Sequence, residues 1–143
     1  MRRLIRLPLL LTTALGLFVG LSVPTQAAEL ARVRGDVCRG GVCGSATFNF
    51  TGIYQLTNVS LSVKDSKCDS HDVYIQLLVY KNTGKVYTTK RRNSKGCRGG
   101  YKAWHGRSFS TNDYIKGVRV RGCVDDPGRD TCYHSRYLDN PNT

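Results

Sequence analysis

Alternating apolar and polar residues recur through most of the chain, and this period of two predicts a series of short β-strands. Residues 46–54 alternate with both phenylalanines on one side, and residues 57–64 alternate with two valines and a leucine on one side. A tight turn near Gln55 would join these two strands as a hairpin. Such alternation is typical of strands that bury one face and expose the other.

A second predicted hairpin lies between Cys68 and Cys97, and the rest of the fold is expected to be organised around it. Residues 72–80 are dense in β-branched, aromatic and aliphatic side chains, which favour strands. Residues 82–84 supply a turn that ends in a glycine, and residues 85–92 alternate and return. The segment therefore predicts two antiparallel strands whose open ends are joined by a disulfide.

The expected register gives the first strand of this hairpin two different faces. Lys81 should face Lys85 across a three-residue loop, and one bulged residue then sets the two cysteines opposite each other. One face is apolar and is assigned to the core, whereas the other is aromatic at several positions and cationic at one end. The core face holds Val73, Ile75, Leu77 and Val79, and the opposite face holds Tyr74, Gln76, Leu78 and Tyr80, beside Val86, Thr88, Lys90 and Arg92 of the returning strand.

The remainder of the chain adds shorter strands separated by glycine-rich turns. Residues 98–113 predict one or two strands, residues 113–122 predict a clear strand with two outward arginines, and residues 132–138 predict a last one. The charged residues 28–37 are expected to form a loose N-terminal arm. About six to eight short antiparallel strands indicate an all-β sandwich or small barrel.

Residues 1–27 have the three-part organisation of a secretory signal peptide. A basic start with Arg2, Arg3 and Arg6 precedes an apolar run, and small residues stand at positions 25 and 27, before a cleavage site. A membrane anchor is the alternative, but the run is short for a span and no later segment is apolar enough to cross a membrane. We therefore expect a cleaved leader and a single secreted, extracellular domain over residues 28–143.

Six cysteines follow the leader, and an even number in a small exported domain predicts a disulfide framework. Sequential pairing is expected because the first and last pairs flank short turn sequences and the middle pair flanks the hairpin. In the loop-entropy treatment the three bridges stabilise the fold by roughly 2, 3.5 and 2.5 kcal/mol. The expected pairs are Cys38–Cys43, Cys68–Cys97 and Cys123–Cys132.

The chain is strongly basic. It holds 22 Lys and Arg against 10 Asp and Glu, and three of its arginines lie in the leader while every acidic residue follows it. The secreted part therefore keeps a net charge of about +9, which attracts polyanions through long-range fields. An anionic polymer, a cell surface or an acidic protein is the expected partner, although charge alone does not choose among them.

The strongest candidate for a binding surface is a run of cations that leads into glycines and aromatic residues. Arg and Lys pair with phosphate, sulfate or carboxylate, and aromatic faces stack on bases or sugar rings. Most charge runs are solvated strand ends or loops, so the run by itself names no ligand. The predicted anion-binding residues are Lys90, Arg91, Arg92, Lys95, Arg98, Tyr101, Lys102 and Trp104, with Tyr74, Tyr80, Arg119 and Arg121 as further members.

Two other functions stay open beside a secreted, non-catalytic binding protein. An inhibitor of an extracellular protease would present an arginine on a rigid disulfide loop, and Arg39 is a better candidate than Arg129, which precedes an aspartate. An exported ribonuclease-like or antimicrobial toxin would need histidines for acid–base chemistry. The spacing of His71, His105 and His134 places no two of them together.

Catalytic, cofactor and metal motifs are lacking in the sequence. It has no GxSxG, HExxH, P-loop or dinucleotide-binding motif. Aspartates recur at 65–72 and 125–130, but neither stretch has an EF-hand pattern and aspartates also favour turns. We therefore predict no catalytic residue, no cofactor and no metal site.

The leader, the sequential cysteines and the ending CVDDPGRDTCYHSRYLDNP together resemble small secreted disulfide-rich β proteins of actinobacteria. This resemblance covers most of the secreted part of the chain. It implies secretion and a disulfide-held β-fold, and it carries over no active site.

Overall fold

Side-chain alternation builds the first of two antiparallel sheets in the computed structural model, which describes residues 31–143. The apolar positions of the two strands predicted over 46–54 and 57–64, among them Phe48, Phe50 and Leu61, are buried as expected. Three successive strands form a meander, and a later strand joins its edge. In order across the sheet these are β1 (Val33–Arg39), β2 (Val42–Thr51), β3 (Gln55–Asp65) and β7 (Lys102–Ser110).

Strand β1 corrects the expectation of a loose arm over residues 28–37. From Val33 onward this segment pairs with β2, because its inward residues Gly35 and Val37 lie on the core. Gly35 leaves room for the other sheet, since a Cβ built there would lie 2.6 Å from a methyl group of Val120. The expected signal peptide over 1–27 lies outside the described residues.

The second sheet is centred on the predicted hairpin and on the strand that follows it in space. The expected core face of the hairpin is confirmed, because Val73, Ile75, Leu77 and Val79 are all buried in the core. The strands are β4 (Val73–Lys81), β5 (Gly84–Tyr87), β6 (Arg91–Asn93), β8 (Ile115–Val124), β9 (Thr131–His134) and β10 (Leu138–Asp139). Both β5 and β6 pair with β4, and both β9 and β10 pair with β8.

The turn of the β4–β5 hairpin is one residue shorter than predicted. Lys81 pairs with Gly84 rather than with Lys85, which leaves a two-residue loop. The Asp113 carboxylate accepts hydrogen bonds from the backbone N–H and the hydroxyl of Thr83, and these bonds hold the tighter turn. The register then shifts by one residue between β5 and β6. The single bulge expected in this hairpin therefore lies within residues 85–92, the returning strand.

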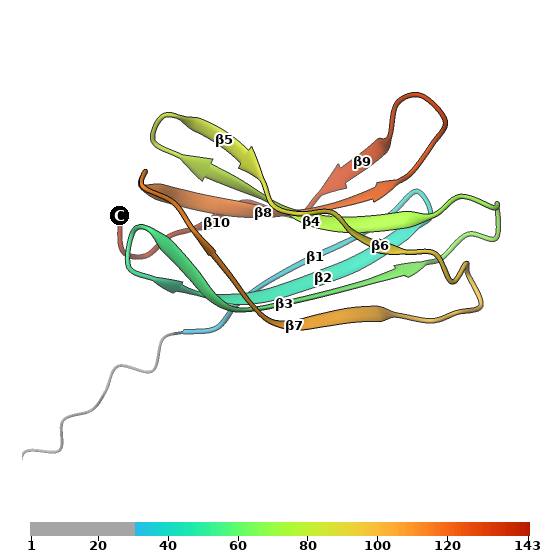
Figure 1. The fold of residues 1–143 in the computed structure, drawn as a ribbon, viewed down its shortest axis with the longest axis horizontal. Helices are drawn as coiled ribbons and strands as arrows, with labels where there is room; N and C mark the ends of the chain where they lie inside the picture. Colours follow the sequence, from blue (N-terminus) through green and yellow to red (C-terminus); the bar gives the residue numbers. More distant parts are fainter. Residues whose placement is uncertain (1–30) are drawn as a thin grey trace, which may run out of the picture.

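The two sheets lie face to face as a sandwich (Figure 1). Apolar side chains from both sheets fill the space between them, including Phe48 and Leu56 from one sheet and Ile75 and Val120 from the other. The all-β prediction is confirmed, and the sandwich rather than the barrel is the architecture. Residues 31–143 form ten strands instead of the expected six to eight, because β1 is added and the returning strand and the segment 132–138 are each divided in two.

The three disulfides have the predicted sequential pairing. Cys38–Cys43 and Cys123–Cys132 each join directly paired strand residues. Cys68 lies in the β3–β4 connection and Cys97 in the β6–β7 connection, so their bond ties together two segments that cross between the sheets. No cysteine of the described chain is free.

Candidate functional site: the outer face of the six-stranded sheet

The outer face of the second sheet gathers cationic and aromatic side chains from four strands. In β4 the residues between the core positions point away from the first sheet. The antiparallel register sets Arg119 beside Leu78 and Arg121 beside Gln76, so the two arginines of β8 stand on this same outer face. Strand β5 adds Tyr87 next to Leu78.

The outer positions of β4 are buried rather than open, although they face away from the core. Tyr74, Gln76 and Leu78 are only 0%, 2% and 5% exposed. Strands β5 and β9 bend away from the first sheet on the two sides of β4 and β8 (Figure 1). The Lys90 ammonium lies 4.3 Å from the centre of the Tyr74 ring.

Four basic side chains form what we call the cation cluster: Lys85, Arg119, Arg121 and His134. His134 stands directly opposite Arg121, because β9 pairs with β8. Burial lowers the pKa of His134, and the nearby charges of Arg121, Arg119 and Lys85 lower it further. Within residues 31–143 none of the four forms an ion pair with an acidic group.

The arginines of the cation cluster also have unused hydrogen-bonding capacity. Among the described residues, the Nε atoms of Arg119 and Arg121 are buried and have no hydrogen-bond partner. The Arg121 guanidinium lies 4.7 Å from the centre of the Tyr87 ring, which is half exposed. A buried donor without an acceptor is costly.

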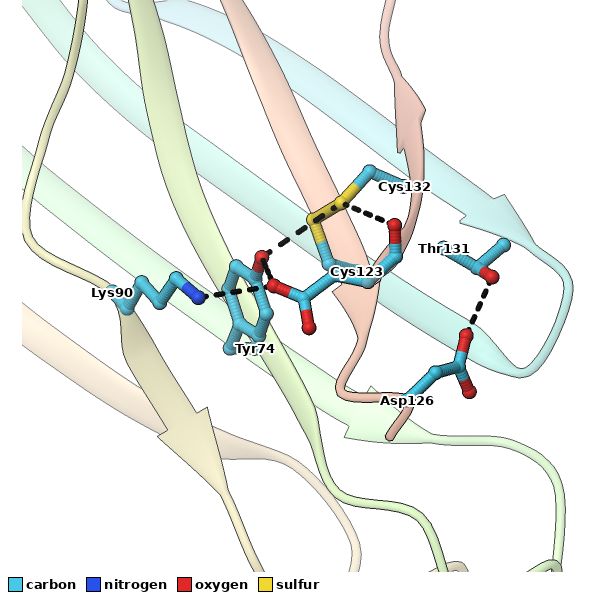
Figure 2. The surroundings of a disulfide bond; sticks show 7 residues. Tyr74, Lys90, Cys123, Asp126, Thr131 and Cys132 are labelled. Atoms are coloured by element: carbon cyan, nitrogen blue, oxygen red, sulfur yellow. Dashed lines mark hydrogen bonds and ion pairs between the residues drawn. A yellow bond between two sulfur atoms is a disulfide. The ribbon is translucent and has the colours of Figure 1, made fainter. Parts of the chain in front are cut away.

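At the other end of this face the charges are balanced. Tyr74 donates a hydrogen bond of 2.6 Å to Asp130, and Lys90 approaches the same carboxylate at 3.0 Å (Figure 2). The Tyr74 hydroxyl also lies 3.8 Å from the sulfur of Cys132 in the Cys123–Cys132 disulfide (Figure 2). The hydrogen bonds from Tyr74 and Lys90 lower the pKa of Asp130, and the bond to Asp130 raises the pKa of Lys90.

The structure divides the predicted anion-binding residues between the two sheets. Tyr74, Tyr80, Lys90, Arg119 and Arg121 are brought together on the second sheet, as the sequence predicts for the case in which their strands share a sheet. Lys102 and Trp104 lie on β7 of the first sheet, with the Lys102 ammonium 5.4 Å from the Trp104 ring, and Tyr101 lines a pocket beside β1. The single patch expected over residues 90–104 is therefore not one surface.

The remaining members of that patch have separate surroundings. Arg92 forms ion pairs with Asp72 and Asp125, so it joins the two acidic loops at the end of the sheet. Lys95 and Arg98 are exposed in the connection that contains Cys97. Arg91 faces the space between the sheets and is treated below.

Sequence reasoning missed three members of this site: Lys85, Tyr87 and His134. The expected register set Val86 and Thr88 beside the outer face of β4. This is wrong, because the two-residue turn pairs Tyr80 with Lys85 and Leu78 with Tyr87. The predicted Cys123–Cys132 bridge could have indicated His134. If the two cysteines face each other across antiparallel strands, the residues two positions away on each strand, Arg121 and His134, also face each other.

The residues of the two alternative functions lie apart from the cation cluster or from one another. Arg39 is exposed at the end of β1, and its guanidinium lies 5.4 Å from the Tyr133 ring. His71 lies in the loop before β4 near Asp69 and Asp126, at 3.6 and 3.9 Å, while the other two histidines stand on β7 and β9. Protease inhibition and nuclease activity stay predictions.

The described residues contain no group of three or more His, Cys, Asp or Glu side chains placed to hold a metal ion. Within the same part of the chain no helix is long and apolar enough to cross a membrane. Comparisons with known protein families, with curated protein sequences and with solved structures find no match.

Proposed function

We propose that the protein is an exported, non-catalytic binding protein and that the cation cluster engages an anionic polymer. The observation that carries the proposal is the pair of buried arginine Nε atoms without acceptors, in a cluster without acidic partners. Folding brings these like charges together, and within residues 31–143 it supplies no acidic partner for either arginine. A phosphate, sulfate or carboxylate group would pair with these guanidinium groups in the bidentate geometry that they favour.

A polymer suits this surface better than a single small anion. The charged members of the cluster, Lys85, Arg119 and Arg121, are spread over β5 and β8, so successive anionic groups can each meet a different cation. The exposed ring of Tyr87 beside Arg121 offers a stacking surface for a base or sugar. Export is supported by three disulfides, which form and persist in oxidising environments.

The test is elution from heparin with rising salt, followed by titration of a single-stranded oligonucleotide at several salt concentrations. The double variant Arg119→Gln/Arg121→Gln should elute at clearly lower salt than the natural chain. Each lost phosphate contact should reduce the slope of log K against log salt by roughly 0.7. Neither arginine has an ion-pair partner in the described chain, so the variant should fold.

The matched control is Arg32→Gln/Lys64→Gln, which removes the same charge from β3 and from the residue that precedes β1 in the first sheet. The control should elute close to the natural chain. Equal elution of the two variants would mean that the protein responds to net charge alone, and it would refute the assignment to the cation cluster.

A further inference from the structure

A pocket of about 230 Å³ opens between the two sheets at the edge formed by β5, β6 and β7. Its floor is apolar and consists of the buried Val59, Leu61 and Leu77 together with the half-buried Phe109. Arg91 from one sheet and Arg107 from the other are also part of its lining. This pocket is separate from the outer face that carries the cation cluster, although Tyr87 lines the pocket and contacts Arg121.

The pocket exists because the edge of each sheet loses regular strand pairing, and the two irregular stretches face each other. On the second sheet β5 ends at Tyr87, and Thr88 replaces the missing strand partner of Leu77. The Leu77 N–H donates to the Thr88 hydroxyl at 2.9 Å, and the Thr88 N–H donates to the Leu77 carbonyl at 3.0 Å. On the first sheet the register shifts on both sides of the Val59–Arg107 pair, next to Gly106 with a φ of 62°.

Strand alternation directs both arginines toward the gap between the sheets. Arg91 pairs with Ile75, and Arg107 pairs with Val59, and both of these partners point into the core. Directly paired residues share a face, so the two guanidinium groups belong to the core side of their strands. Within the described chain neither arginine forms an ion pair or a side-chain hydrogen bond with an acidic group.

Inward charges on edge strands can have a purely protective role, because they block edge-to-edge aggregation. That role needs no cavity, whereas here two unpaired cations from facing sheets share one pocket with an apolar floor. We propose that this pocket binds a small amphipathic carboxylate, with its apolar body on Val59, Leu61 and Leu77 and its carboxylate between Arg91 and Arg107.

The volume sets the size of the ligand. An apolar cavity of about 150 Å³ accommodates benzene, so this pocket accommodates a phenyl ring extended by a short chain. 4-Phenylbutyrate has this shape and about a dozen non-hydrogen atoms, for which a dissociation constant on the order of 1 mM is expected. Its amide, 4-phenylbutanamide, has the same shape without the charge.

The experiment is a titration of the intact, disulfide-bonded protein with 4-phenylbutyrate, followed by amide chemical shifts. We expect saturable shifts at Leu77, Thr88 and Arg107. The uncharged amide should bind about tenfold more weakly or worse, since it loses the charge-assisted pairs. This comparison uses the natural chain, so it does not depend on the folding of any variant.

The variant Arg91→Gln/Arg107→Gln should weaken binding of the carboxylate by a similar factor, whereas Arg32→Gln/Lys64→Gln should leave it unchanged. Equal binding of acid and amide, or full binding by the variant that lacks both pocket arginines, would overturn the proposal. Absence of saturable shifts would also overturn it and would leave the two arginines with edge protection alone. The cation-cluster variant should bind the carboxylate normally, so the two proposals fail independently.

Discussion

Tyr74→Phe tests whether the hydroxyl of a fully buried tyrosine holds the β8–β9 loop to the centre of the sheet. The change removes one oxygen atom and keeps the ring, which stays packed beneath Lys90. What is lost is the 2.6 Å hydrogen bond to the Asp130 carboxylate. A hydrogen bond to a charged group contributes about 1.5–3 kcal/mol.

The lower part of that range applies here. The Asp130 side chain is 22% exposed and keeps its 3.0 Å contact with Lys90, so water and the ammonium replace part of the lost bond. We expect the free energy of unfolding at pH 7 to fall by about 1.5 kcal/mol, which corresponds to a decrease in Tm of roughly 6 °C for a domain of this size. Urea unfolding followed by the fluorescence of Trp104, the one tryptophan, measures it.

The pH dependence of the difference identifies its cause. Because the folded pKa of Asp130 is lowered, its stabilising contribution is complete above the unfolded pKa and disappears as the pH falls through the folded value. The difference in unfolding free energy between Tyr74→Phe and the natural chain should therefore narrow as the pH falls below the usual pKa range of an aspartate. Tyr80→Phe is the control, since its hydroxyl has no hydrogen-bond partner in the described chain. A loss below about 0.5 kcal/mol at pH 7, or a loss independent of pH, would refute the reasoning.

Two further predictions concern stability. Reduction of all three disulfides should unfold or severely loosen the protein, because their combined contribution of roughly 8 kcal/mol is comparable to the net stability of a small domain; a melting curve unchanged in excess reductant, with thiols shown to be free, would contradict this. Asn93→Asp should cost about 3 kcal/mol at pH 7, because the buried amide donates to the carbonyls of Val63 and Gly100 at 2.9 and 3.0 Å and a carboxylate cannot. Since burial beside carbonyls raises the pKa of the new carboxyl, the loss should shrink as the pH falls, and urea unfolding at two pH values checks it.

The strands and the disulfides were predictable because short-range rules govern them. Alternation assigned the buried positions of β2, β3, β4 and β8, and the turn sequences between near cysteines indicated sequential pairing. The predicted turn of the β4–β5 hairpin was one residue too long. The observed turn depends on hydrogen bonds from Thr83 to Asp113, and local sequence does not reveal bonds between residues 30 positions apart. Strand β1 was missed because its partner, rather than its own composition, makes it a strand.

The candidate site was predictable only in part. The outward direction of Arg119 and Arg121 follows from the pattern of β8, but their position beside β4 depends on a long-range pairing. Contiguity in sequence was a poor guide to the basic run 90–104, because the chain crosses from β6 in one sheet to β7 in the other within it. The sequence also could not predict that Asp130 neutralises Lys90, since the two residues are 40 positions apart.

The Cys68–Cys97 bond has a consequence for survival among extracellular proteases. Lys90 and Arg92 are exposed in the returning strand, where trypsin-like enzymes would find their preferred residues. The other two disulfides each lie on one side of that point, so Cys68–Cys97 is the one bond that spans it. A single cut there would leave two polypeptides still joined at the end of the sandwich. Such a nicked protein would run as one band on a gel without reductant and as two with it.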